Sequence, residues 1–101
     1  MSVYVVAHNR IDNREMLARY VSQALPTIER HGGRVVAYDE KPQVIEGKVE
    51  HPRTVIVEFP SEAAFRAWYD SPEYQAILPD RLNAGPGSLI LARGLAAASS
   101  A

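Results

Sequence analysis

The chain has 101 residues, of which 47% are hydrophobic and 23% are charged, and its formal net charge is -1. This length corresponds to one domain, which buries only about 60–65% of its unfolded surface and is commonly stabilised by association. The interspersed charges exclude steering toward nucleic acid or an anionic membrane, the lack of cysteine excludes disulfides and thiol chemistry, and no apolar run reaches the roughly 20 residues that span a bilayer.

The first part of the chain predicts two strands around one long helix. Residues 3–7 (VYVVA) form a strand that is apolar on both faces. We expect the helix to open at Asp12, with a glutamate three residues on in capping-box spacing. Its apolar stripe continues at period 3.6 past Pro26, where the pattern predicts a kink rather than two helices. A glycine pair starting at Gly32 ends the helix, one glycine taking the left-handed conformation, and residues 34–38 (RVVAY) form the next strand.

The middle of the chain predicts a polar excursion, a buried strand and two helices. Residues 39–52 contain two prolines and a glycine, and we expect a hairpin-like excursion with a short strand near residues 43–46. Residues 54–59 (TVIVEF) form a strand rich in β-branched side chains. Ser61 caps the first helix through its hydroxyl. Ser71, followed by proline and an acid, starts a second helix that we expect to be short or bent.

The order of these elements predicts an α+β, ferredoxin-like βαββαβ fold in a single domain over residues 1–94. The last strand covers residues 88–93 (SLILAR), and residues 95–101 form a frayed tail. We expect a four-stranded antiparallel sheet in the order last, first, third and second, with helices on one face. Because the central strands are apolar on both sides, a second copy is the simplest cover for the open face. We therefore expect a homodimer that packs sheet against sheet.

A long motif resembles a known family. The motif is RTVIVEFPSEAAFRAWYDSPEYQ at residues 53–75, together with HGGR at residues 31–34, EG at residues 46–47, and Arg81. These features resemble the domain-of-unknown-function family DUF1330, within the dimeric α+β barrel superfamily, over residues 3–94. The resemblance implies a ferredoxin-like protomer that forms a two-sheet barrel as a dimer. The superfamily contains cofactor-free monooxygenases and haem-degrading enzymes, whereas the family itself implies no particular activity.

Two residues are candidates for catalysis. His8 follows a central strand and could approach the Arg53 end of its neighbour, where it would be a general base at a pocket mouth or an exposed strand-end histidine. Glu58 interrupts an apolar strand and could be a base with a raised pKa or the structural partner of Arg53 or Arg81. The structural pair is the favoured interpretation for Glu58.

Five further residues are candidates for ligand binding: Tyr38, Arg53, Tyr69, Tyr74 and Arg81. The tyrosines could form an aromatic wall against an apolar ligand, or belong to the core with their hydroxyls paired. Arg81 could hold a carboxylate bidentately or bind carbonyls at a helix end. The three histidines lack the spacing of metal ligands, so we expect no metal and no cofactor.

Two classes of function fit these residues. The first is a homodimer that binds a small organic molecule, with a cofactor-free enzyme of monooxygenase or isomerase type as a variant. In that class His8, Glu58, Tyr74 and Arg81 converge on a cavity of a few hundred Å³ between sheet and helices. The second is a non-catalytic dimerisation module, in which these polar groups satisfy one another. Whether the protein is an enzyme stays open. We expect a bacterial protein of the cytoplasm.

Overall fold

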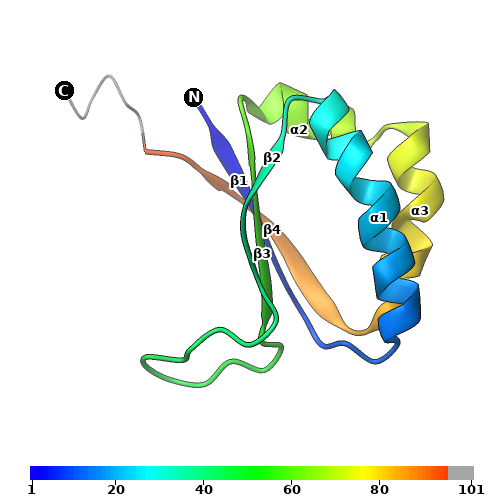
Figure 1. Ribbon diagram of the computed structural model, residues 1–101. Coiled ribbons are helices and arrows are strands. Elements are labelled where there is room, and N and C mark those ends of the chain that lie inside the picture. Colours follow the sequence, from blue (N-terminus) through cyan, green and yellow to red (C-terminus); the bar gives the residue numbers. More distant parts are fainter. Residues whose placement is uncertain (96–101) are drawn as a thin grey trace.

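The computed structural model describes residues 1–95 and contains one sheet with helices on one side (Figure 1). Seven elements follow one another along the chain: β1 (Val3–Asn9), α1 (Arg14–Arg30), β2 (Arg34–Asp39), β3 (Arg53–Phe59), α2 (Glu62–Tyr69), α3 (Pro72–Ala84) and β4 (Gly87–Arg93). With the second helical position divided between α2 and α3, this is the expected βαββαβ order, which is confirmed. The tail expected at residues 95–101 lies outside the described residues beyond residue 95.

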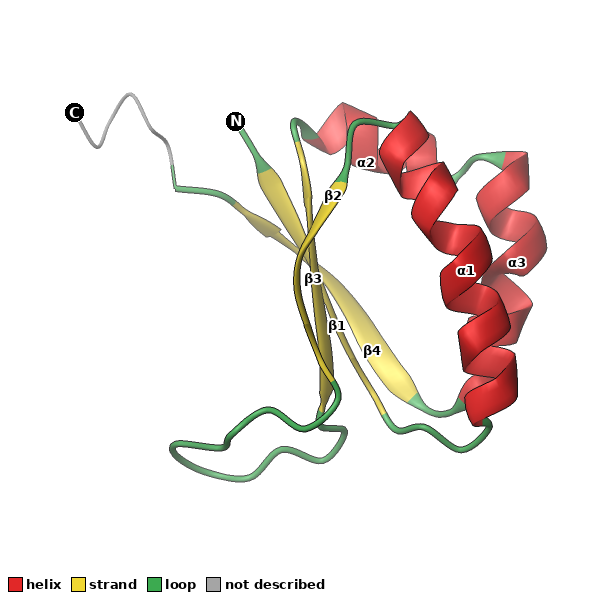
Figure 2. Ribbon diagram, in the orientation of Figure 1, coloured by secondary structure: helices red, strands yellow, loops and turns green. Residues whose placement is uncertain are grey.

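The sheet has the strand order β2-β3-β1-β4, and every neighbouring pair is antiparallel. The expected order, with β1 and β3 in the middle, is therefore confirmed. Val5 lies opposite Val57 on β3 and Leu91 on β4, and the ladder between β2 and β3 shifts between Val35 and Ala37. All three helices lie on the same side of the sheet (Figure 2). One sheet face is thus covered and the other is open.

Side-chain caps determine where the helices begin. The Asn13 side chain accepts a hydrogen bond from a backbone N–H of the first turn at 2.9 Å, so Asn13 caps α1 and the expected cap, Asp12, is wrong. The Asp12 carboxylate is instead held by the Arg10 guanidinium, with the closest contact at 2.8 Å. Ser61 and Ser71 cap α2 and α3 as expected.

Two further local expectations are wrong. α1 remains one helix through Pro26, as expected. α3 continues through Pro79 to Ala84 and has 13 residues, so the expectation that it is short is wrong, while the alternative of a bend stays a prediction. α3 packs along α1, and this tertiary packing offsets the backbone hydrogen bond that proline removes. No strand forms at residues 43–46, because β2 pairs only with β3 and the excursion meets no partner strand within the described chain.

The core lies between the three helices and the covered face of the sheet. Successive side chains of a strand alternate between its faces, so Val57 and Phe59 on β3 point toward the helices and are buried. Phe59 and Tyr74 are fully buried, and the Trp68 ring lies 5.3 Å and 4.1 Å from their respective ring centroids. This aromatic group holds the α2–α3 segment against β3.

The open face has one apolar row between two polar rows. The apolar row crosses the four strands through Ile90, Val6, Ile56 and Ala37. Ile90 is 57% exposed. On one side of this row Glu58 accepts a hydrogen bond from Arg34 at 2.8 Å, and on the other the Thr54 hydroxyl lies 3.1 Å from His8 Nδ1. The open face is therefore apolar only in its middle.

Candidate functional site

A cavity of about 70 Å³ lies between α1 and the covered face of the sheet. Its walls are mostly apolar: Val5, Val57 and Leu89 come from the sheet, and Val21, Ala24 and Ile28 come from α1. Tyr38 also lines the cavity and is 49% exposed, so it marks the mouth. The volume is below the few hundred Å³ that we expected and suits a small group with several heavy atoms.

Arg53 is the first residue of β3 and extends under the helices. Its side chain is buried, with only 5% of the residue exposed. One guanidinium nitrogen donates to Asn9 Oδ1 at 2.8 Å, which follows from the register that places Asn9 opposite Arg53. The guanidinium also lies over the Tyr38 ring, 4.8 Å from its centroid. The Arg53 Nε atom has no hydrogen-bond partner.

Arg81 approaches the same cavity from α3, beside two buried phenols. The hydroxyl oxygens of Tyr20 and Tyr74 are 2.8 Å apart. Burial raises the pKa of Tyr20 far above its ordinary value, with Tyr74 acting in the same direction and Arg81 and Arg53 against it. Burial also raises the pKa of Tyr74, against the opposing charge of Arg81. Both phenols therefore stay neutral near pH 7, and the Arg81 Nε is buried without a partner.

The two cavity arginines differ from the other arginines of the chain. Seven arginines lie within 4.0 Å of a carboxylate oxygen: Arg10, Arg14, Arg19, Arg30, Arg34, Arg66 and Arg93. The remaining two are Arg53 and Arg81, and across residues 1–95 neither forms an ion pair. The guanidinium groups without an acidic partner are thus the two that line the cavity.

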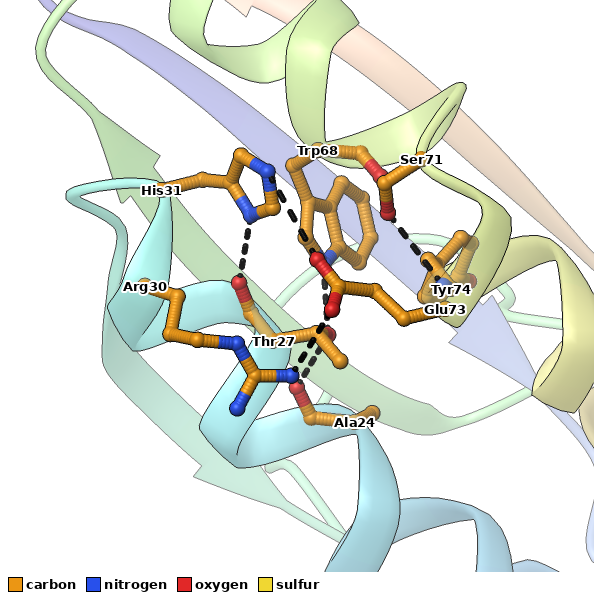
Figure 3. Close-up of polar contacts among 8 residues, drawn as sticks. All are labelled: Ala24, Thr27, Arg30, His31, Trp68, Ser71, Glu73 and Tyr74. Atoms are coloured by element: carbon orange, nitrogen blue, oxygen red, sulfur yellow. Dashed lines mark hydrogen bonds and ion pairs between the residues drawn. The ribbon is translucent and has the colours of Figure 1, made fainter.

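A second polar cluster joins the end of α1 to α2 and α3, and here the groups are paired (Figure 3). The Thr27 hydroxyl accepts from Trp68 Nε1 at 2.9 Å and donates to the Ala24 carbonyl at 2.7 Å. His31 Nδ1 lies 2.8 Å from the Thr27 carbonyl oxygen, and His31 Nε2 lies 3.9 Å from Glu73. This cluster fixes the Trp68 ring, which forms part of the cavity wall.

The structure brings together three of the five expected ligand-binding residues. Tyr38, Arg53 and Arg81 line the cavity. Tyr74 lies behind the wall, where its hydroxyl contacts that of Tyr20. Tyr69 lies outside the wall and packs on Tyr74, with ring centroids 5.6 Å apart.

The expected convergence of His8 and Glu58 on this cavity is wrong. Both side chains lie on the open face. His8 pairs with Thr54, and Glu58 follows Thr54 by an even number of residues on β3, so both lie on the face opposite to that of Arg53. Glu58 pairs with Arg34 rather than with Arg53 or Arg81. Hydrogen bonding from Arg34 holds the pKa of Glu58 below its ordinary value, so the residue lacks the raised pKa expected for a catalytic base.

Sequence reasoning missed two residues next to the cavity arginines. Tyr20 reads as one more member of the apolar stripe of α1, although it is the member that carries a hydroxyl. Asn9 was visible only as a strand-end residue. The antiparallel pairing expected for His8 and Thr54 also places Asn9 beside Arg53, and this was the signal available in the sequence.

Residues 1–95 contain neither a metal-binding cluster nor a membrane-spanning helix. No group of three or more His, Asp or Glu side chains there is arranged to hold a metal ion. In the same range no helix is long and apolar enough to cross a membrane.

The fold is similar to those of several solved structures. A protein of unknown function from Rhodopseudomonas palustris matches with TM-score 0.76 and 24% identity, covering 94% of this chain and 83% of that chain. A dimeric ferredoxin-like protein of unknown function from Jannaschia sp. matches with TM-score 0.67 and 10% identity, covering 93% and 100%. A variant of SnoaB, a cofactor-independent oxygenase from Streptomyces nogalater, matches with TM-score 0.68 and 13% identity, covering 94% of both chains. At these identities the likeness shows the fold alone.

The sequence itself was compared with family models and with curated proteins. No curated protein matches it. The family model described as "Domain of unknown function (DUF1330)" matches residues 2–95, which is nearly the whole chain. The resemblance noted in the motif around Trp68 is therefore confirmed, and the protein belongs to the DUF1330 family.

Proposed function

We propose that the protein binds a small organic molecule in the cavity between α1 and the sheet. The observation that carries the proposal is an apolar cavity lined by two guanidinium groups, Arg53 and Arg81, whose Nε atoms are buried without an acceptor. Buried polar groups are normally paired, so a molecule that brings acceptors into the cavity completes the site. The exposed edge at Tyr38 lets the rest of such a molecule extend into solvent.

In this proposal the candidate residues have different roles. Tyr38, Arg53 and Arg81 contact the ligand directly. Tyr74 acts through its hydroxyl contact, which positions the Tyr20 ring at the cavity wall. Tyr69 supports Tyr74 from behind.

The test is an NMR titration of isotope-labelled protein with benzoate, benzamide, hexanoate and hexanamide. We expect at least one compound to shift the backbone amides of Val21, Ala24 and Leu89, which surround the cavity. Ala24→Leu fills the cavity and abolishes these shifts. Ala18→Leu is the matched control, because Ala18 lies on the exposed side of the same helix. If none of the four compounds shifts these amides, the binding function is wrong and a non-catalytic dimerisation module is the better description.

Catalysis by a cofactor-free route is the weaker candidate. Burial raises the pKa values of the Tyr20 and Tyr74 phenols, and guanidinium groups stay protonated, so these groups do not accept protons near pH 7. His8, the expected base, lies on the other sheet face. The likeness to SnoaB concerns the fold, so we place ligand binding ahead of catalysis.

We also propose that two copies pack through their open sheet faces. The middle row of that face leaves Ile90 57% exposed beside Val6 and Ile56. Covering a large aliphatic side chain stabilises an assembly by about 1.5–3 kcal/mol, and the polar rows on each side favour one register over others. The similar Jannaschia protein is described as dimeric, which supports this arrangement.

Sedimentation velocity tests the dimer. We expect the wild-type protein to sediment as a dimer and Ile90→Glu to sediment as a monomer, because the carboxylate would be buried in the apolar row. Ile45→Glu is the matched control, since Ile45 is 78% exposed in the loop between β2 and β3. A wild-type monomer, or an Ile90→Glu variant that still forms dimers, contradicts the proposed interface.

A further inference from the structure

Two buried nitrogen donors of cavity-lining residues lack an acceptor: Arg53 Nε and Arg81 Nε. Asn9 Nδ2 also lacks one, and Asn9 lies directly behind the cavity wall, where its Oδ1 accepts from Arg53. A guanidinium offers donors and no acceptor, so its natural complement is a group that only accepts. An ionised carboxylate is such a group, and it matches the planar fork of arginine with two parallel hydrogen bonds.

The chain does not supply this carboxylate from its described residues. Glu40 lines a neighbouring hollow together with Tyr38. Hydrogen bonding from Arg14 lowers the pKa of Glu40 most, and the charge of Arg53 contributes in the same direction. The two oxygens of Glu40, however, accept from the two terminal nitrogens of Arg14 at 3.1 Å each. Among residues 1–95 no acid lies within 4.0 Å of the Arg53 or Arg81 guanidinium. Two cations that share a mostly apolar cavity without an acid in direct contact are unfavourable, and an anionic ligand relieves that cost.

The walls restrict the class of anion. Beyond the donors, the cavity is lined by aliphatic side chains such as Val21, Ala24 and Leu89. Inorganic anions leave such walls unused, whereas an organic acid places its hydrocarbon part against them and its charge on the arginines. We propose that the ligand is a small monocarboxylate, held by Arg53 and Arg81 and packed against α1. This inference rests on the proposed binding function and names its ligand class.

The experiment compares each acid with its uncharged amide of nearly the same shape. Benzoate and benzamide form one pair and hexanoate and hexanamide the other, titrated at neutral pH and followed at the amide of Ala24. We expect each acid to bind at least about tenfold more tightly than its amide, as two charge-assisted hydrogen bonds predict.

Arginine variants assign this preference to the cavity. Arg81→Gln keeps a donor and removes the charge, so the acid loses about tenfold in affinity while the amide changes by less than about twofold. Arg53→Lys keeps the charge and removes the fork, and a similar loss for the acid is expected. If Arg81→Gln does not fold, the Arg53→Lys variant alone tests whether the cavity arginines bind the acid. Arg19→Gln is the matched control, because Arg19 is exposed on α1 and pairs with Asp80; it should retain wild-type affinities.

The outcomes distinguish failure of the carboxylate assignment from failure of the proposed small-molecule binding. Equal affinities for acid and amide overturn the carboxylate assignment and leave small-molecule binding intact. Tighter binding of inorganic phosphate than of benzoate at the same Ala24 amide also overturns it, because the ligand class is then different. If no compound shifts the Ala24 amide, the inference and the proposed function fail together.

Discussion

Two polar clusters lie between the sheet and the helices or among the helices, and they differ in how their hydrogen bonds are completed. Around Thr27, the Trp68 indole and the His31 ring find partners within the chain at 2.8–2.9 Å. Around the cavity, Arg53 and Arg81 retain buried donors without an acceptor. The first cluster joins the helices to one another, so its groups contribute to folding. The second leaves buried donors without an acceptor beside an apolar cavity, and the proposed ligand would supply the acceptors.

The comparison leads to opposite expectations for substitution. When a group of the Thr27 cluster is removed, its buried hydrogen-bond partner is left unpaired and away from water, and the free energy of unfolding decreases. Removing a cavity arginine relieves an unpaired charge and costs binding instead. Substitutions in the Thr27 cluster should therefore lower stability, and substitutions of the cavity arginines should lower binding.

Trp68→Ala should have the largest effect. Trp68 is 3% exposed and contacts Phe59 and Tyr74 as well as Thr27. Truncating a buried aromatic side chain costs about 3–5 kcal/mol, measured by urea unfolding. A loss below about 1 kcal/mol would mean that this cluster does not support the fold.

Thr27→Val keeps the size of the side chain and removes only the hydroxyl. Trp68 Nε1–H then has no acceptor in a buried position, so the free energy of unfolding should fall by about 1–3 kcal/mol. Thr27→Ser, which keeps the hydroxyl, is the matched control and should lose less. Equal losses for the two variants would show that the methyl group, and not the hydrogen bond, supports the structure.

The Tyr20 and Tyr74 phenols predict a pH dependence on the alkaline side. Burial raises both pKa values in the folded state, so above about pH 10 the unfolded phenols ionise while the folded ones stay protonated. Stability should therefore fall with rising pH, by up to about 1.4 kcal/mol per pH unit for Tyr20 and with a further contribution in the same direction from Tyr74. Tyr20→Phe should reduce that slope in urea unfolding series. An unchanged slope in the variant would contradict burial of the Tyr20 hydroxyl.

Arg53→Met should change the free energy of unfolding by less than about 1 kcal/mol, although the residue is nearly as buried as Trp68. The loss of the Asn9 hydrogen bond is offset by removal of a buried, unpaired charge. Benzoate binding should nevertheless be lost. A loss of several kcal/mol without ligand would place Arg53 in the same class as Thr27.

Glu73→Gln should have the smallest effect, below about 1 kcal/mol, because exposed ion pairs contribute little. Glu73 lies 3.2 Å from Arg30 and 3.9 Å from His31, and its side chain is 45% exposed. Thermal and urea unfolding of the variant should overlay closely with the wild type. A larger loss would extend the stabilising cluster out to its exposed edge.

Much of the fold could be predicted from local patterns. The caps at Ser61 and Ser71 and the strand order follow from residue types, spacing and known topology, and the structure agrees. The start of α1 could not be chosen so simply, since Asp12 and Asn13 are both good caps. The choice between them depends on Arg10, which binds Asp12 through a contact that spacing alone does not reveal.

The site was predicted only in part, and strand geometry explains why. Arg53 and Arg81 were identified by residue type. His8 was grouped with them through the pairing of its strand with β3, and Glu58 as a possible partner of either arginine. Alternation along β3 nevertheless sends Glu58 and Arg53 to opposite faces. The absence of a partner for the two arginines depends on where every acid of the described chain lies. That information exists only once the tertiary structure is known.

One consequence follows from the positions of the two cavity arginines. Arg53 belongs to the sheet and Arg81 to the helical layer, and mainly apolar side chains join those layers around them. A bound acid would cross-link sheet to helix, because its single carboxylate would contact both guanidinium groups. Binding would then raise the melting temperature, and at a fixed concentration a tighter ligand would raise it more, so a thermal-shift screen of metabolite acids is a direct route to the physiological ligand.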